Sequence, residues 1–456
     1  MDKHVRVAAV DLGASHGRVI RGVFDGETLA MEVISDFDNR PVELSGSYYW
    51  NHLAMAKNVL EGLEKAGEIA SIGVDAWGHD FIPVTGRGDP LGAMYSYRDP
   101  RTDRMAAYVR ERLKEADAYA LTGEAVNPIA TRVQLCALMR EQPEIYAAAN
   151  GILFVADYIN YLLCGERRCN ETQVSMGGLL DLQTRGWCRT VCEKLGLRDD
   201  WGRIVRVGET VGKRSDGARV IAVAAHDTAS ALSFLPGYTD RNLLVSSGTW
   251  ALVGVKTGAP VMDARALHGD LQVELGANSE LLQINNLTGM WIMQELAREW
   301  GGVNFDALNL EAARSDYNET VDTQDASLSA PGDMARKLTT LTRIKGVKTP
   351  KTQADFYRLV LLSLCKRFTD TIQTLEALYG VSYEAINVVG GGARNRYFNQ
   401  LIADQTGKKV IAGPYEATAI GSMLEQLLAL GVLSSREEAA RVLERSFPPE
   451  IYTPGI

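Results

Sequence analysis

Long apolar runs and clustered basic residues are both missing from this sequence of 456 residues. No apolar stretch approaches the ~18 residues that a membrane-spanning helix requires. The first apolar stretch, residues 5–10, has the length of a strand and runs directly into Asp11, unlike a secretory signal. The net charge is −9 and there is no lysine or arginine run, which argues against a nucleic-acid-binding surface. A cytoplasmic protein with neither a membrane nor a nucleic acid as partner is therefore expected.

Cysteine is also scarce, with 6 residues in the whole chain. Cys188 and Cys192 would share one helix face, which makes them a conceivable metal pair. Cys164 and Cys169 do not complete this pair to a familiar zinc spacing. Reduced, buried cysteines are therefore the preferred interpretation for a cytosolic protein, and the sequence leaves open whether any pair is linked.

Two familiar nucleotide-binding signatures are absent as well. No glycine-rich turn is followed by Gly-Lys-Ser or Gly-Lys-Thr, which excludes the P-loop class. The glycine run at residues 390–392 lacks the Gly-x-Gly-x-x-Gly spacing of dinucleotide-binding folds, which weakens that interpretation. With 46% apolar and 23% charged residues, the composition is that of a globular protein. The chain exceeds the roughly 250–300 residues at which single cores stop growing, so two domains are expected.

Strand and helix patterns alternate along the chain, which predicts a two-domain α/β protein. The clearest helix is expected at residues 356–378, where apolar residues recur every three or four positions. A turn-rich hexapeptide marks the break between domains 1–236 and 237–456. Each half opens with a strand, a turn of small and hydroxyl residues and a second strand, at residues 7–18 and 243–250. This recurrence predicts a duplicated fold whose turns face each other across a cleft, with chance repetition as the alternative.

Both turns suit phosphate binding, because small residues let successive backbone N–H groups point into one concavity that attracts anions. The first turn, residues 13–17, contains Ser15 and is followed by Arg18, which adds a charge-assisted donor. The second turn, residues 247–249, adds the hydroxyl of Thr249. Ordinary hairpin turns are the alternative for either motif alone.

Asp11 stands at the end of the first strand, just before a turn that would bind phosphate. A carboxylate there repels phosphate unless a cation lies between them. Mg²⁺, which takes one or two carboxylates and keeps most of its waters, resolves the conflict. A turn-forming aspartate is the alternative. The glycine run at residues 390–392 follows a predicted strand and allows a flat or phosphorylated ligand to approach the backbone.

A fourth motif, Ala225-His226-Asp227-Thr228, joins a strand to the top of a helix just before the domain break. Phosphoryl transfer to a sugar hydroxyl needs a group that accepts the hydroxyl proton, and an aspartate is the usual choice. At a domain junction, Asp227 would face the cleft. A helix N-cap is the alternative for Asp227, and a structural hydrogen-bonding role is the alternative for His226.

Together and in this order, the four motifs resemble those of the FGGY carbohydrate kinases, which belong to the actin and hexokinase superfamily of ATPases. The motifs are residues 9–15, 225–228, 246–250 and 389–395, within a resemblance that extends from Val5 to about Leu430. The resemblance implies two actin-like (ribonuclease H-like) α/β domains, each a mixed five-stranded sheet flanked by helices, with an interdomain cleft. It also implies an ATP-dependent sugar kinase that uses Mg²⁺, with small-molecule sugar and ATP as partners and a monomer or a homodimer as its state.

The same resemblance implies a role for individual residues. The ATP site would be formed by Ala14, Ser15, His16, Gly17, Arg18, Thr249, Gln294 and Gly391. The sugar site would be formed by Gly78, His226, Asp227, Thr228 and Asn286. Asp227 would be the general base, and Asp11 would bind Mg²⁺ through water.

Three stretches, residues 11–19, 71–81 and 286–291, resemble the L-rhamnulose kinases of the family, so phosphorylation of L-rhamnulose to its 1-phosphate is expected. His79 and Ala130 depart from that pattern near the sugar site, which keeps L-fuculose, L-ribulose and D-xylulose as alternatives. The imidazole of His79 either projects into the sugar site or points away from it. A non-catalytic ATPase or sugar sensor of the same superfamily is the rival from another class.

Overall fold

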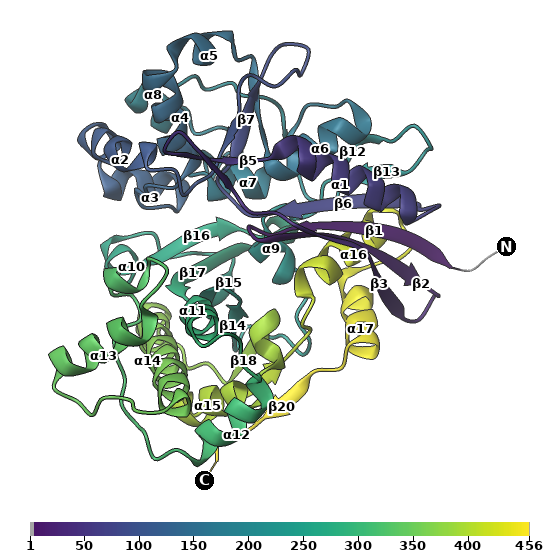
Figure 1. Cartoon of the computed structure of the whole chain (residues 1–456). Helices are drawn as coiled ribbons and strands as arrows, with labels where there is room; N and C mark the ends of the chain where they lie inside the picture. Colours follow the sequence, from purple (N-terminus) through teal and green to yellow (C-terminus); the bar gives the residue numbers. More distant parts are fainter. Residues whose placement is uncertain (1–3, 456) are drawn as a thin grey trace.

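Two mixed β-sheets, one from each half of the chain, lie at the centre of the computed structural model, which describes residues 4–455 (Figure 1). The first sheet contains β1 (Val5–Leu12), β2 (His16–Phe24), β3 (Leu29–Asp38), β6 (Ser71–Ala76), β12 (Thr210–Lys213) and β13 (Arg219–Ile221). The second sheet contains β14 (Asn242–Ser247), β15 (Trp250–Thr257), β16 (Leu271–Leu275), β17 (Leu281–Thr288), β18 (Ala385–Val389), β19 (Lys409–Ala412) and β20 (Glu450–Tyr452). The strand orders are β12-β13-β6-β1-β2-β3 and β16-β17-β15-β14-β18-β19-β20.

The two sheets repeat one topology, which confirms the predicted duplication. Within the first sheet the order β3-β2-β1-β6-β13 has two antiparallel pairings followed by two parallel ones. The order β17-β15-β14-β18-β19 in the second sheet has the same pairings in the same sequence. Both sheets therefore share a five-stranded unit with the strand–turn–strand motif at its centre.

The expected strand number of five is wrong for both sheets, which have six and seven strands. The additional strands β12, β16 and β20 each pair antiparallel with an outer strand of the repeated unit. Added edge strands satisfy backbone N–H and C=O groups that would otherwise be unpaired. They carry no strong sequence signal because each is short.

Helices and three small sheets complete the chain. In the first half the helices are α1 (His52–Lys65), α2 (Arg101–Arg112), α3 (Glu115–Thr122), α4 (Thr131–Glu141), α5 (Pro143–Ala148), α6 (Val155–Cys164), α7 (Glu171–Met176), α8 (Arg189–Leu195) and α9 (Asp227–Ala231). In the second half they are α10 (Ala264–His268), α11 (Trp291–Glu299), α12 (Phe305–Arg314), α13 (Met334–Lys345), α14 (Gln353–Tyr379), α15 (Arg396–Thr406), α16 (Ala417–Ala429) and α17 (Arg436–Ser446), with short 3-10 turns at Ala277–Ser279, Ala326–Leu328 and Gly391–Arg394. The small sheets pair β4 (Val42–Leu44), β5 (Ser47–Trp50) and β8 (Met94–Tyr95), then β7 (Phe81–Val84) with β9 (Gly151–Phe154), and β10 (Cys169–Asn170) with β11 (Ile204–Val205).

The predicted long helix is α14, which begins three residues before the predicted start at residue 356. Thr352 and Asp355 form a capping box that satisfies backbone N–H groups at its start. The stripe, including Leu359, Phe368 and Ile372, is buried in the core of the second half. No helix within residues 4–455 is both long and apolar enough to cross a membrane. All six cysteines are unpaired, and all but Cys164 are fully buried.

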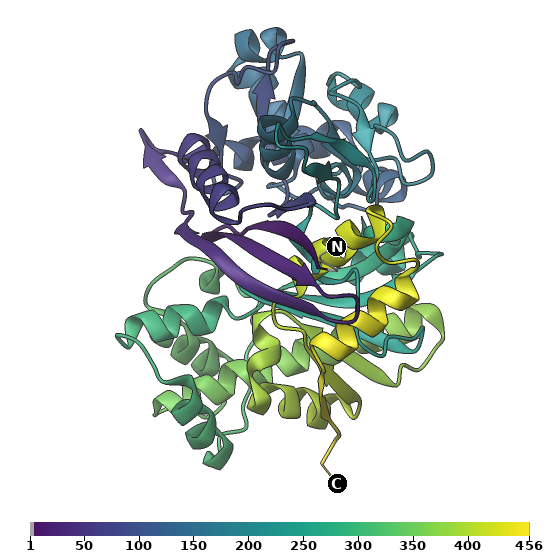
Figure 2. The ribbon, with the colours of Figure 1, turned by 90° about the vertical axis from the view of Figure 1, so that its right-hand side faces the viewer.

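The end of the chain returns to the first sheet. Helices α16 and α17 lie beside β1, β2 and β3, where the last part of the chain meets the first in both views (Figures 1 and 2). Ile420 and Met423 of α16 share a buried core with Val7 and Ile20 of the first sheet. The first sheet is therefore covered on this face by helices from the far end of the sequence, and the two halves are joined by a shared core.

Gly421 of α16 provides a test of this junction. A Cβ atom at Gly421 would lie 2.0 Å from the backbone oxygen of Ser230 in α9, and neither backbone can move without disturbing the packed core. Gly421→Ala should lower the free energy of unfolding by about 3 kcal/mol, at the upper end of overpacking costs, measured by urea denaturation. Gly258→Ala, where a Cβ meets nothing within 4 Å, is the control. Equal stability of the two variants would contradict the close α9–α16 packing.

Candidate active site

The first turn joins β1 to β2 and is closed by a hydrogen bond from Gly13 N to His16 O of 2.8 Å. The Asn39 side chain donates to Gly13 O, also at 2.8 Å, and braces the turn from the end of β3. Ser15 and His16 are exposed at its tip, as donors to a ligand must be. The turn is thus preformed, with its side chains free toward solvent.

Arg18 is engaged by carboxylates. Asp11 and Arg18 are cross-strand neighbours on β1 and β2, and Arg18 Nη2 lies 2.5 Å from Asp11 Oδ2. Arg18 Nη1 lies 2.7 Å from Glu416 Oε2, while Arg394 Nη2 lies 2.9 Å from Glu416 Oε1. Glu416 therefore links the first turn with the glycine run of the second half, whose 3-10 turn ends at Arg394. Arg18 and Glu416 are 398 residues apart in the sequence.

A second carboxylate lies beside Asp11. Asp75 of β6 is the parallel-register neighbour of Asp11, and within the described residues neither of its buried oxygens has a hydrogen-bond partner. Burial raises the pKa of Asp75 well above its usual range, and the charges of Asp11 and Asp227 add to the effect. Burial also raises the pKa of Asp11, although Arg18 opposes this. Sequence reasoning assigned no role to Asp75, although it lies in one of the stretches that carry the resemblance.

The second turn gathers the remaining nucleotide candidates. Gly248 N donates to Trp250 O at 2.9 Å, and Gln294 Nε2 lies 3.4 Å from the hydroxyl of Thr249. Gly390 has a φ of 82°, and a Cβ there would lie 3.0 Å from Ser247 O. Only glycine fits this left-handed, crowded position, which brings the glycine run against the second turn. Thr249, Gln294 and the glycine run therefore form one group.

The sugar-site candidates of the first half also come together. His226 precedes α9 and itself forms an isolated parallel bridge to Ala76 at the end of β6. A Cβ at Gly78 would lie 3.4 Å from His226 Cδ2, so Gly78 lies beside the His226 ring with no room for a larger side chain between them. The backbone N–H of Thr228 donates to Asp227 Oδ1 at 2.6 Å. The Asp227 side chain remains 39% exposed, which leaves its carboxylate accessible.

Asn286 reaches the same region from the second sheet. On β17, Leu282 and Ile284 pack against Ala231 and Leu232 beside α9. Asn286 shares their face because strand side chains alternate, and its Oδ1 is buried without a partner in the described part of the chain. The second sheet thus turns a polar group toward the helix that carries Asp227.

Glu274, on the neighbouring strand β16, was missed by sequence reasoning. It stands opposite Leu282 in the β16–β17 register and so shares the face of Asn286. Its Oε2 lies 3.1 Å from His226 Nδ1, and His226 Nε2 lies 3.4 Å from Asp227 Oδ1. Burial alone would lower the pKa of His226, but the charge of Glu274 raises it to about 9. His226 is therefore a cation at neutral pH, held between two carboxylates.

His79, which departs from the rhamnulose kinase pattern, is buried, and its backbone has a φ of 79°. Its carbonyl accepts a 2.7 Å hydrogen bond from the hydroxyl of Thr131, next to Ala130 at the start of α4. Burial, followed by the positive charges of His226 and Arg132, lowers the pKa of His79 to about 3. The imidazole is neutral and lies within electrostatic range of His226, on the side of the candidate sugar residues.

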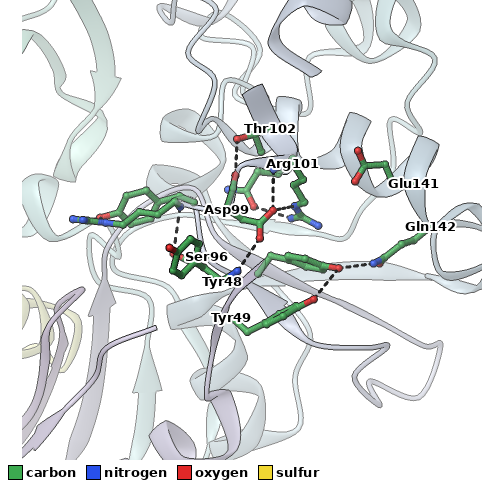
Figure 3. Close-up of polar contacts among 12 residues, drawn as sticks. Tyr48, Tyr49, Ser96, Asp99, Arg101, Thr102, Glu141 and Gln142 are labelled. Atoms are coloured by element: carbon green, nitrogen blue, oxygen red, sulfur yellow. Dashed lines mark hydrogen bonds and ion pairs between the residues drawn. The ribbon is translucent and has the colours of Figure 1, made fainter. Parts of the chain in front are cut away.

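A polar network lies next to His79 and Thr131. Gln134 Nε2 donates to Asp80 at 2.8 Å, and Arg101 Nη2 donates to Gln134 Oε1 at 3.2 Å. Figure 3 shows Asp99 accepting from the backbone N–H groups of Tyr48 and Arg101, at 2.8 and 3.0 Å. These bonds fix the loop between β8 and α2 against α4, so His79 and the start of α4 are held in one geometry.

Comparisons with known proteins agree over the whole chain. Residues 9–226 match the FGGY family of carbohydrate kinases, N-terminal domain, and residues 243–430 match its C-terminal domain. A rhamnulokinase of Halalkalibacterium halodurans is 32% identical, covering 97% of this chain and 98% of that protein. A rhamnulokinase of Bacillus subtilis is 31% identical, covering 98% and 95%. The fold is similar to that of a xylulose kinase from Rhodospirillum rubrum, with a TM-score of 0.78, 19% identity and 99% and 94% coverage.

The charge on His226 predicts a pH dependence of stability. Its pKa of about 9 in the fold exceeds the ordinary value of about 6.5. A raised histidine pKa stabilises the fold fully below about pH 6.5, and this contribution is lost as the pH rises through about 9. The free energy of unfolding of the ligand-free protein, measured by urea denaturation, should therefore fall as the pH rises from about 6.5 to about 9.

Glu274→Gln should reduce this fall, because it removes the charge that raises the pKa of His226. The pKa of Glu124, which burial raises to about 8, adds a fall of the same sign to both proteins. Glu384→Gln, an exposed carboxylate paired with Arg241, is the control and should behave as wild type. Equal falls in wild type and Glu274→Gln would show that Glu274 does not hold the charge on His226.

Proposed function

Because the chain belongs to the FGGY family of carbohydrate kinases, we propose that it transfers the γ-phosphoryl group of ATP to the primary hydroxyl of a ketose, with Asp227 as general base. The observation that carries this assignment is the accessible carboxylate of Asp227 at the junction of the two sheets, beside the candidate sugar residues Gly78 and His226. The rhamnulokinase relatives favour L-rhamnulose as the ketose and L-rhamnulose 1-phosphate as the product.

In this proposal Asp227 takes the proton from the sugar's primary hydroxyl as the oxygen bonds to the γ-phosphorus and ADP leaves. The neighbouring His226 cation lies 3.4 Å from the base. Gly78, Thr228 and Asn286 place the sugar. Most of the rate enhancement then comes from positioning and charge neutralisation rather than from covalent chemistry.

We assign the phosphates of ATP to residues 14–18, Thr249, Gln294 and Gly391, since Glu416 joins the first turn to the glycine run that follows β18. Mg²⁺ suits Asp11 and Asp75, because they supply hard carboxylate oxygens and those of Asp75 lack partners among the described residues. No three His, Cys, Asp or Glu side chains within residues 4–455 are grouped to bind a metal directly, which is compatible with an ion held largely through water. When bound, Mg²⁺ neutralises the phosphate charge that these aspartates would repel.

The domain limits 1–236 and 237–456 are part of the same proposal. The phosphate-binding motifs come from both parts of the chain, and closure of the parts would align the γ-phosphoryl group with the sugar. A divided site of this kind also excludes water, which protects ATP from hydrolysis when no sugar is bound.

Asp227→Asn tests the assignment of the base. The amide keeps the shape of the carboxylate but accepts no proton, so turnover should fall by ~10² or more while ketose binding stays nearly unchanged. ADP release in a coupled assay gives turnover, and calorimetry gives binding. Asp240→Asn, at an exposed aspartate, should keep full activity. Near-wild-type turnover of Asp227→Asn would remove Asp227 from this role.

A kinetic panel of L-rhamnulose, L-fuculose, L-ribulose, D-xylulose and glycerol tests the substrate. L-rhamnulose should have the highest kcat/KM, because sites built for one hydroxyl pattern reject others by large factors. If another ketose is best, the L-rhamnulose assignment fails while the kinase assignment stands. ADP release that is independent of every sugar would instead favour a non-catalytic ATPase.

A further inference from the structure

Three buried side chains around His226 have acceptor atoms without a partner among the described residues, and we call His79, Glu124 and Glu274 the acceptor cluster. Each of the three is at most 4% exposed. Glu124 and Glu274 both act electrostatically on His226, as His226 does on His79. Glu274 thus contacts the histidine that precedes Asp227, and Glu124 and His79 lie within electrostatic range of that histidine.

Within residues 4–455, the ion-pair partner of Glu274 is the His226 cation, and the Glu124 carboxyl has no hydrogen-bond partner. Both oxygens of Glu124 and both of Glu274 lack a well-directed hydrogen bond, although Glu274 Oε2 is 3.1 Å from His226 Nδ1. Arg132, whose charge acts on Glu124, donates to the backbone carbonyls of Glu124 and Gly178 rather than to a carboxylate. Buried polar groups in native proteins are normally hydrogen-bonded, and leaving them unpaired is costly.

The atoms of the acceptor cluster that lack a hydrogen bond can all act as acceptors. The His79 ring is hydrogen-bonded to the backbone of Met176 and leaves Nδ1 as an acceptor. Glu274 and Glu124 each offer at least one acceptor oxygen, although burial raises the pKa of Glu124 to about 8. A complementary ligand must present O–H or N–H donors.

We propose that Glu124 and Glu274 accept hydrogen bonds from the secondary hydroxyls of the ketose and so determine which configuration of these hydroxyls is accepted. This inference rests on the proposed function, because it places the ketose beside His226 and Asp227. The two carboxylates come from different halves of the chain, one before α4 and the other on β16. A ketose bound by both bridges the halves.

Glu124→Gln tests the proposal with L-rhamnulose and L-fuculose, which differ at a single hydroxyl-bearing carbon. The amide keeps the size of the side chain but replaces one acceptor by a donor. The wild-type ratio of kcat/KM between the two ketoses should shrink at least ~10-fold, with a raised KM for the better ketose and an unchanged KM for ATP. Glu274→Gln should shrink the same ratio and serves as the second variant if Glu124→Gln does not fold.

Glu425→Gln is the matched control, since Glu425 is another buried carboxylate but is paired with Arg436; it should keep the wild-type ratio. A wild-type ratio in both cluster variants, or a KM for ATP that rises as much as that for the ketose, would overturn the proposal. If the wild type phosphorylates no ketose, the proposed function fails separately, and calorimetric affinities of the two ketoses replace kcat/KM. Absence of ketose binding would then overturn the inference too.

Discussion

The ion pair between His226 and Glu274 is the interaction on which the rest of the site depends. His226 follows the first sheet and immediately precedes Asp227, whereas Glu274 belongs to an edge strand of the second sheet. Strand β16 is anchored to the first half along its length: Val273 N donates to Gly123 O at 2.8 Å, and Leu275 N donates to Ser175 Oγ at 3.1 Å. Glu274, whose carboxylate keeps His226 protonated, is therefore held in place by the bonds that anchor β16 to the first half.

The site contains several buried carboxyl oxygens that have no well-directed hydrogen bond among the described residues. Asp75 and the acceptor cluster would each be more stable in water or beside a donor. A protein tolerates such groups where a ligand satisfies them, because stability is then recovered on binding. The unpaired groups are divided between the candidate metal side, beside Asp11, and the candidate sugar side, beside His226. This division matches the two ends of a phosphoryl transfer, with Asp227 between them.

Features that depend on near neighbours in sequence could be predicted. The strand–turn–strand motifs and α14 follow from local periodicity, and the motif around Asp227 from its place between a strand and a helix. The three edge strands were not predicted because each is short, although β12 and β16 pair with the next strand along the chain. The return of α16 to the first sheet depends on packing between residues as far apart as Val7 and Met423. Glu124 and Glu274 had no signal either, since 150 positions separate them and only the fold brings both to His226.

The central claim is that the ketose lies between the two halves, with its primary hydroxyl on Asp227 and its secondary hydroxyls on Glu124 and Glu274. A crystal structure of Asp227→Asn grown with L-rhamnulose and a non-hydrolysable ATP analogue tests this most directly. The account predicts sugar oxygens within hydrogen-bonding distance of residue 227 and of both glutamates, and the γ-phosphate facing the primary hydroxyl. A ketose bound away from His226, with both glutamates still unpaired, would contradict it.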